Sequence, residues 1–149
     1  MTISVDLQIA TLSKNIPAPG EIERWVCTAL SDIRDNAEMT VRIVDEVEAT
    51  ELNKRWRQAN GPTNVLSFPV DGNEAFVPEL LGDIVICAPV IEKEAESQKK
   101  SIQAHWAHMV VHGTLHLLGF DHGNDTDAEK METLEIQILD KLGITNPYI

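Results

Sequence analysis

Cysteines and basic residues are scarce in this sequence, and long apolar runs are missing. The two cysteines, Cys27 and Cys87, lie in unrelated segments without the spacing of a metal site, so we interpret them as small buried residues of a reducing compartment. No stretch approaches the ~20 apolar residues that are needed to cross a bilayer. The opening MTISVDLQIA has no basic segment followed by an apolar one, as a signal peptide would. The sequence therefore predicts a cytoplasmic protein.

Positive charge is in deficit, because 12 lysines and arginines stand against 24 aspartates and glutamates, a net charge of −12. Proteins that bind nucleic acid over a wide surface normally carry a basic footprint, which argues against that mode of binding here. The exception is a local basic cluster of Lys54, Arg55 and Arg57. An anionic ligand would have to be held locally, by this cluster or by a metal ion.

Apolar periodicity predicts one domain over residues 1–149, with four strands and about five helices. The strands are expected at residues 3–9, 39–47, 64–70 and 81–88. The helices are expected at residues 21–33, 50–57 and 89–98, after an N-cap at Ser101, and after an N-cap at Asp125 or Thr126. This order predicts an α+β (mixed α/β) fold, with a small mixed four-stranded sheet packed against the helices. Residues 71–79 are expected to form a loop that could cover a cleft.

All five histidines lie within residues 105–122, HWAHMVVHGTLHLLGFDH. His112 and His116 are four residues apart, which places both on one face of a helix. His122 would lie about 120° away if the helix continued. Gly119 is placed to end the helix in a left-handed conformation and to turn His122 back. Three imidazoles with an open fourth position are the ligands of a catalytic zinc ion, so the sequence predicts a metal centre on a buried helix.

The residues near these three histidines leave several interpretations open. His108, one turn before His112, is either a packed residue or a partner of a metal ligand, whereas His105 is expected on the helix surface. Asp121 is placed to accept a proton from a ligand histidine or to act on an attacking water. It is also the nearest fourth ligand if the zinc is structural.

The glutamate of the H-E-x-x-H peptidase motif is absent, because Gly113 follows the first ligand histidine. Gly113 costs a helix about 1 kcal/mol relative to alanine. Space for a substrate, or the close approach of a helix or a strand, would account for it. Arg57 is the candidate for holding a phosphate or stabilising developing negative charge, because its planar guanidinium binds oxyanions bidentately. Lys54 and Arg55 are expected to be surface residues or to make weak contacts to the backbone of a ligand.

The stretch HGTLHLLGFDH at residues 112–122 resembles the H-G-x-L-H-L-x-G-[YF]-D-H signature of the YbeY family, the bacterial endoribonucleases and rRNA maturation factors. Further similarity runs through Leu52-Asn53, Trp56-Arg57, PTNVLSFP at 62–69 and LGDI at 81–84. Phe120 stands where tyrosine is common in the family, which removes one hydroxyl.

The resemblance implies one Zn²⁺ per chain, held by His112, His116 and His122, with Arg57 as the critical catalytic residue. It implies cleavage of single-stranded RNA, 3′-end maturation of small-subunit (16S) rRNA and ribosome quality control. The implied partners are rRNA and the small ribosomal subunit or its proteins, with neither DNA nor a membrane expected. Two other functions stay open: a zinc hydrolase of peptides or amides, and a non-catalytic ribosome-assembly factor whose zinc is structural.

Overall fold

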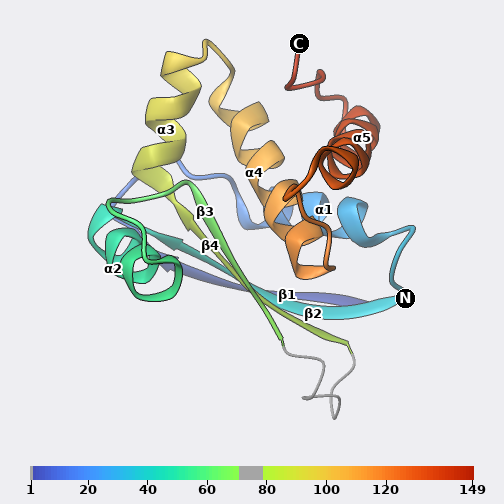
Figure 1. The fold of residues 1–149 in the computed structure, drawn as a ribbon, viewed down its shortest axis with the longest axis horizontal. Coiled ribbons are helices and arrows are strands. Elements are labelled where there is room, and N and C mark those ends of the chain that lie inside the picture. The colour runs from blue at the N-terminus through green and yellow to red at the C-terminus, as the bar shows by residue number, and fades with distance from the viewer. Residues whose placement is uncertain (1, 71–78) are drawn as a thin grey trace.

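The computed structural model describes residues 2–70 and 79–149 (Figure 1). Four strands and five helices follow one another in this part of the chain. In order, they are β1 (Thr2–Ala10), α1 (Pro19–Leu30), β2 (Asn36–Val44), α2 (Glu46–Arg57), β3 (Val65–Pro69), β4 (Leu80–Cys87), α3 (Ala88–Ser97), α4 (Ile102–Leu117) and α5 (Asp125–Lys141). The predicted α+β fold is confirmed. The loop expected at 71–79 lies, except for Glu79, outside the described residues.

The sheet has the strand order β1-β2-β4-β3. β1, β2 and β4 run parallel, and β3 pairs antiparallel with β4 at one edge, with Val65 opposite Ile86 and Pro69 opposite Gly82. Pro69 lacks a backbone N–H, and an edge strand tolerates that loss. Among the described residues, β3 therefore has one side free of strand pairing.

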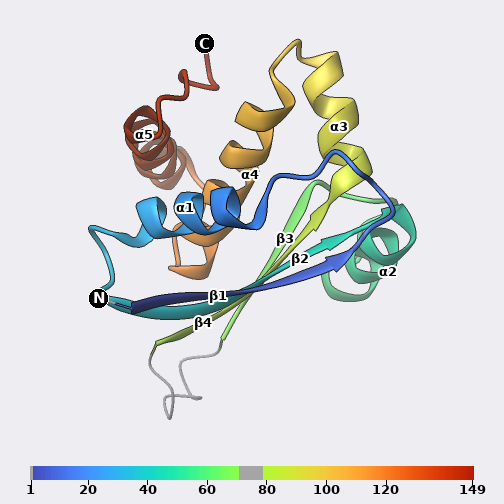
Figure 2. The same cartoon turned by 180° about the vertical axis from the view of Figure 1, so that it is seen from behind.

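The two faces of the sheet are covered unequally, as Figures 1 and 2 show. Helices α1, α4 and α5 lie on one face, with the main apolar core between them and the sheet. Helix α2 lies on the opposite face, over a smaller cluster that includes Val44, Leu66 and Val85. Because α4 packs against the sheet and against three other helices, most of its residues are buried, as its apolar composition predicts. None of the described helices is both long and apolar enough to cross a membrane.

The boundary between β2 and α2 differs from the one expected. Strand β2 ends at Val44 and α2 begins at Glu46. Between them, the Asp45 carboxylate accepts from the Thr11 hydroxyl and the Leu12 N–H. Val47, which seemed to continue the strand, is exposed on α2.

The sequence predicts N-cap residues for α4 and for α5. Ser101 caps α4 as predicted, with its hydroxyl accepting from the Ala104 N–H at 3.0 Å. The prediction of Asp125 or Thr126 as the cap of α5 is wrong. Asn124 is the cap, because its side-chain oxygen accepts from the Asp127 N–H at 2.9 Å.

Candidate metal centre

The three histidines predicted as ligands come together in space. One ring nitrogen of each of His112, His116 and His122 lies within 4.8 Å of the others. The Nε2 atoms of His112 and His116 are 3.1 Å apart. Zinc–nitrogen bonds of ~2.0–2.1 Å at tetrahedral angles would place two ligand nitrogens about 3.3 Å apart. The arrangement therefore fits a single metal ion held by three imidazoles.

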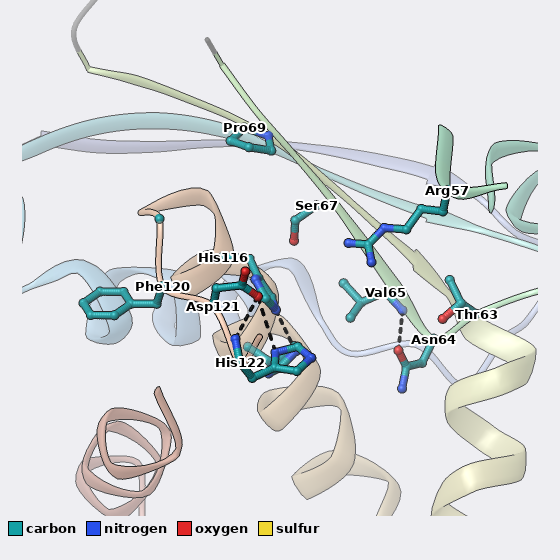
Figure 3. Close-up of a pocket in the computed structure, with 12 residues that line it drawn as sticks. Arg57, Thr63, Asn64, Val65, Ser67, Pro69, His116, Phe120, Asp121 and His122 are labelled. Carbon is teal, nitrogen blue, oxygen red and sulfur yellow. Dashed lines mark hydrogen bonds and ion pairs between the residues drawn. The ribbon is translucent and has the colours of Figure 1, made fainter. Parts of the chain in front are cut away.

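Gly119 brings the third histidine into this group. Its φ of 97° lies in the left-handed region, which glycine adopts without steric cost. The Gly119 N–H donates to the His116 carbonyl at 3.0 Å, and the Phe120 N–H donates to the Leu115 carbonyl at 3.2 Å. These two bonds form the Schellman motif that ends α4. The chain then turns back so that His122 faces the other two rings, as the spacing predicts (Figure 3).

Glu135, on α5, fixes the orientation of His112. Its Oε1 lies 2.5 Å from the His112 Nδ1, and its side chain is fully buried. Burial raises the pKa of Glu135, but hydrogen bonds from His108, His112 and Tyr148 outweigh it and lower the pKa to about 2. An ionised carboxylate only accepts hydrogen bonds, so the His112 Nδ1 carries the proton. The His112 Nε2 therefore presents its lone pair to the other two histidines.

Sequence reasoning did not single out Glu135, although the helix pattern holds a signal. Glu135 follows Met131 by four residues and precedes Ile138 by three, so it shares the apolar face of α5 with these two buried residues. A carboxylate on a buried face needs hydrogen-bonding partners. A charged residue on the apolar face of a helix therefore indicates a hydrogen-bonding partner on a neighbouring helix, here His112 of α4.

His116 is suited to bind a metal ion at neutral pH. Burial, followed by the nearby His112 and His122, lowers its pKa to about 4. The ring is therefore neutral at pH 7, and it keeps a lone pair that a metal ion can use.

Asp121 lies at the mouth of the centre, with 68% of its side chain exposed. Its Oδ1 accepts from the His122 N–H at 2.7 Å and lies 4.0 Å from the His122 Nδ1. The second distance is too long for a hydrogen bond. Asp121 therefore stabilises the turn around His122 and keeps a carboxylate beside the ligands.

The remaining histidines of α4 are both buried. The expectation that His105 lies on the helix surface is wrong: it is 3% exposed, and its Nε2 lies 2.9 Å from the Glu94 Oε1 on α3. Burial lowers the pKa of His105, although Glu94 opposes this shift. His108 faces the centre, with its Nε2 3.4 Å from the Glu135 Oε1 and 3.3 Å from the Tyr148 hydroxyl.

A cleft of about 510 Å³ opens over the three histidines. Figure 3 shows Arg57, the last residue of α2, extending past β3 with its guanidinium directed into this cleft. The other lining residues are Thr63, Asn64, Val65, Ser67, Pro69, Gly119, Phe120 and Asp121. Lys54 and Arg55 do not line it; Lys54 is exposed, and the Arg55 guanidinium lies 5.5 Å from the centre of the Trp56 ring. The structure thus brings only Arg57 of the basic cluster to the histidines.

Gly113 allows α4 to approach the sheet closely. A β-carbon at this position would lie 3.1 Å from methyl groups of Ile84 and Val65. The Gly113 carbonyl also accepts from the Ser67 hydroxyl at 3.1 Å. Of the explanations for this glycine, close packing against neighbouring strands is the one observed.

Comparisons with known proteins agree with this geometry. The chain resembles the solution structure of TM1509 from Thermotoga maritima with a TM-score of 0.61 and 22% sequence identity, over 92% of this chain and 91% of that one. At this identity the likeness establishes the fold alone. The family model described as endoribonuclease YbeY matches residues 8–143, which include Arg57, the three convergent histidines and Glu135. Since this match covers nearly all of the 149 residues, the chain belongs to the endoribonuclease YbeY family.

Proposed function

We propose that this protein is a zinc-dependent endoribonuclease of the cytoplasm that cleaves single-stranded RNA. Its substrate is the 3′ end of small-subunit (16S) rRNA precursor, and the same activity serves ribosome quality control. The observation that carries the proposal is the meeting of three histidines and one arginine in a single open cleft. The family match supports an RNA substrate.

The metal ion would be held by His112, His116 and His122. When bound, a zinc ion with three neutral ligands keeps its full positive charge and lowers the pKa of a bound water toward roughly 7. The chain prepares the ligands beforehand, since Glu135 fixes the tautomer of His112 and burial keeps His116 neutral. This local positive charge suits an anionic substrate in a protein of net charge −12.

Arg57 would bind the scissile phosphate. Its planar guanidinium can hold two phosphate oxygens at once and can stabilise the charge that develops on them during cleavage. Asn64, another polar residue of the cleft, is engaged by the scaffold. The Asn64 amide nitrogen lies 3.2 Å from Glu94, and the Asn64 oxygen accepts from the Val65 N–H at 2.7 Å.

Asp121 would be the proton acceptor on the cleft side. Its carboxylate lines the cleft, is largely exposed, and accepts a hydrogen bond from the His122 N–H. It can therefore take a proton from an attacking water or from the 2′-hydroxyl of the RNA. The product ends distinguish these two nucleophiles, because a 2′,3′-cyclic phosphate requires internal attack by the 2′-hydroxyl.

Two observations favour this function over the alternatives. A structural zinc site normally has four protein ligands, but no cysteine, carboxylate or further histidine among the described residues joins the group of three. A zinc peptidase of the H-E-x-x-H type needs a glutamate as its general base. The corresponding position here is Gly113, which packs against β3 and β4.

The proposal is tested by metal analysis and by cleavage of single-stranded RNA, with wild type, Arg57→Ala and Arg57→Lys compared. We expect one zinc per chain in all three proteins. Loss of a group that stabilises developing charge typically costs about 10²–10³-fold in rate, so Arg57→Ala should be slower by this factor. Arg57→Lys should recover only part of the rate, because lysine cannot bind bidentately. Wild-type cleavage by Arg57→Ala would refute the role of Arg57, and turnover of peptides without RNA cleavage would refute the endoribonuclease.

The rRNA substrate needs a separate test. Precursor small subunits with an unprocessed 3′ end should be cut faster than the same RNA free of protein, because an acidic protein gains little affinity from long-range charge. Single-stranded DNA of the same sequence is the control and should not be cut. Equal rates on subunits and on unrelated free RNA would refute the maturation role while leaving the nuclease intact.

A further inference from the structure

Tyr148 lies in the segment after α5, beyond residue 143 where the family match ends, and it does not line the cleft. Its hydroxyl nevertheless reaches the carboxylate that orients His112. We propose that Tyr148 is a positioning residue of the metal centre: it fixes Glu135, which fixes His112, so that the segment after α5 helps to set metal affinity. This inference rests on the proposed function in one respect, that His112 is a metal ligand.

The two carboxylate oxygens of Glu135 have different partners. Oε2 accepts from the Tyr148 hydroxyl, and Oε1 accepts from the His112 Nδ1 at 2.5 Å. His108 contacts both Tyr148 and Glu135, with its Nε2 3.3 Å from the Tyr148 hydroxyl and 3.4 Å from the Glu135 Oε1. The rings of His108 and Tyr148 meet edge to face, with centroids 5.4 Å apart. The carboxylate is thus held at both oxygens and cannot turn without breaking a hydrogen bond.

The segment after α5 is itself folded so as to hold Tyr148 in place. Gly143 adopts a φ of 76°, and the Ile144 N–H donates to the Leu139 carbonyl at 2.8 Å, which ends α5 and reverses the chain. The Tyr148 N–H then donates to the Asn146 side-chain oxygen at 2.8 Å. Tyr148 is 46% exposed overall, but its hydroxyl lies against Glu135 of α5 and His108 of α4. Partial burial and the Glu135 carboxylate raise the pKa of the phenol and keep it protonated as a donor.

Tyr148 also borders a second cavity beside the three histidines. This cavity of about 300 Å³ is lined by His112, His122, Glu135 and Tyr148 among others, and it shares the two histidines with the cleft that holds Arg57. The Glu135–Tyr148 pair therefore borders a different cavity from the cleft that Arg57 lines.

Removal of the phenol hydroxyl should loosen the centre without removing a ligand. In Tyr148→Phe the ring can still pack against His108, but the buried Oε2 loses its donor. A buried acceptor without a partner is costly, so the carboxylate should turn or take up a proton. In either case the His112 Nδ1 proton is held less firmly, and both tautomers of His112 become populated.

The test is a double-mutant cycle on zinc affinity, measured by competition with a chelator, for wild type, Tyr148→Phe, Glu135→Gln and the double variant. Loss of a residue that orients a metal ligand typically lowers affinity about 10–100-fold. We expect Glu135→Gln to fall within that range and Tyr148→Phe to lose about tenfold, the lower end. Because Tyr148 acts through Glu135, the double variant should be no weaker than Glu135→Gln alone. Ile149→Ala, at an exposed neighbour, is the control and should bind zinc as wild type does.

Two further measurements separate positioning from general stability. The visible spectrum of the Co²⁺-substituted protein should shift in Tyr148→Phe and remain unchanged in Ile149→Ala. In the metal-free wild type, ¹⁵N NMR of the His112 ring should show the proton on Nδ1, and this needs no variant to fold. Wild-type affinity in Tyr148→Phe, additive losses in the double variant, or a wild-type His112 protonated on Nε2 would each overturn the inference.

None of these measurements uses RNA, so the inference and the proposed function can fail separately. If wild type binds zinc but cuts no RNA, while the cycle is non-additive as expected, the positioning role stands and the nuclease does not. If RNA is cut but Tyr148→Phe keeps the zinc affinity and the Co²⁺ spectrum of wild type, the nuclease stands and the positioning role does not.

Discussion

Helix α4 carries two histidine–carboxylate pairs about two turns apart, and they differ in which ring nitrogen is used. His105 uses Nε2 to contact Glu94 on α3, at 2.9 Å. His112 uses Nδ1 to contact Glu135 on α5, at 2.5 Å. Each carboxylate accepts a hydrogen bond from the ring nitrogen that carries the proton. The ring nitrogen that stays free therefore differs between His105 and His112.

The free nitrogen decides what each histidine can do. In His105 it is Nδ1, which is buried and without a hydrogen-bond partner among the described residues. In His112 it is Nε2, which lies 3.1 Å from the His116 Nε2 at the base of the cleft. The direction from which the carboxylate arrives thus makes one histidine structural and leaves the other available for a metal ion.

The largest difference should appear when His112 and His105 are each replaced by alanine. His112→Ala removes a proposed ligand, so it should lose zinc and lower RNA cleavage by more than the ~100-fold that loss of a ligand's partner costs. His105→Ala should keep zinc and activity, and it should only lower the unfolding temperature, because Glu94 loses a donor. Metal content and circular dichroism are measured on both. If His105→Ala also lost zinc while folded, the distinction between the two pairs would be wrong.

Neutralising the two carboxylates should sharpen the same contrast. Glu135→Gln should weaken zinc binding by about 10–100-fold, as expected for the partner of a ligand. Glu94→Gln is the matched control, because it makes the same change in the carboxylate that pairs with His105. It should leave zinc affinity unchanged. Chelator competition measures both. Equal losses in the two variants would show that the carboxylates act through overall stability.

The pH at which Tyr148 ionises should depend on Glu135 and not on Glu94. Tyr148 is the only tyrosine of the chain, so tyrosinate absorbance reports on it alone. Burial and Glu135 raise its pKa, so in wild type and Glu94→Gln the phenol should ionise above the ordinary value of about 10. A raised pKa in the folded state means that this contribution to stability is lost as pH rises above about 10. Glu135→Gln should bring ionisation back toward the ordinary value; an unchanged titration would exclude the hydroxyl–carboxylate contact.

The smallest effect is expected at Gly113, which lies beside His112 and sets the distance of α4 from the sheet. Gly113→Ala gains about 1 kcal/mol of helix propensity, but its methyl would crowd Ile84 and Val65 at 3.1 Å. Overpacking typically costs about 1–3 kcal/mol, so we expect a net loss of roughly 1 kcal/mol in the free energy of unfolding. Urea denaturation measures it. A more stable variant with normal zinc affinity would contradict this prediction, because it would show that Ile84 and Val65 shift to accommodate the methyl group.

Local patterns predicted that His112, His116 and His122 converge, because the features that bring these residues together are close in sequence. The i, i+4 spacing of His112 and His116 and the left-handed Gly119 are enough to direct three rings to one point. The strands and helices were likewise predictable, because each has an apolar face of its own period. The metal centre could therefore be located from eleven residues.

The supporting contacts could not be predicted in this way, because each joins residues far apart in the chain. Glu135 lies 23 positions after His112, and Glu94 lies 11 positions before His105 on another helix. The Asp45 carboxylate, just before α2, accepts from the Thr11 hydroxyl, which lies 34 positions away. A polar residue on an apolar helix face indicates that a partner exists, but only the packing of the helices identifies it.

The most direct test of the metal centre is single-turnover cleavage of single-stranded RNA at equal zinc occupancy. Wild type, Arg57→Ala and Glu94→Gln are compared, with zinc content measured on the same samples. We expect Glu94→Gln to match wild type and Arg57→Ala to be slower by about 10²–10³-fold with its zinc intact. Equal rates for wild type and Arg57→Ala, or cleavage that persists after zinc is removed, would contradict a catalytic centre built from three histidines and one arginine.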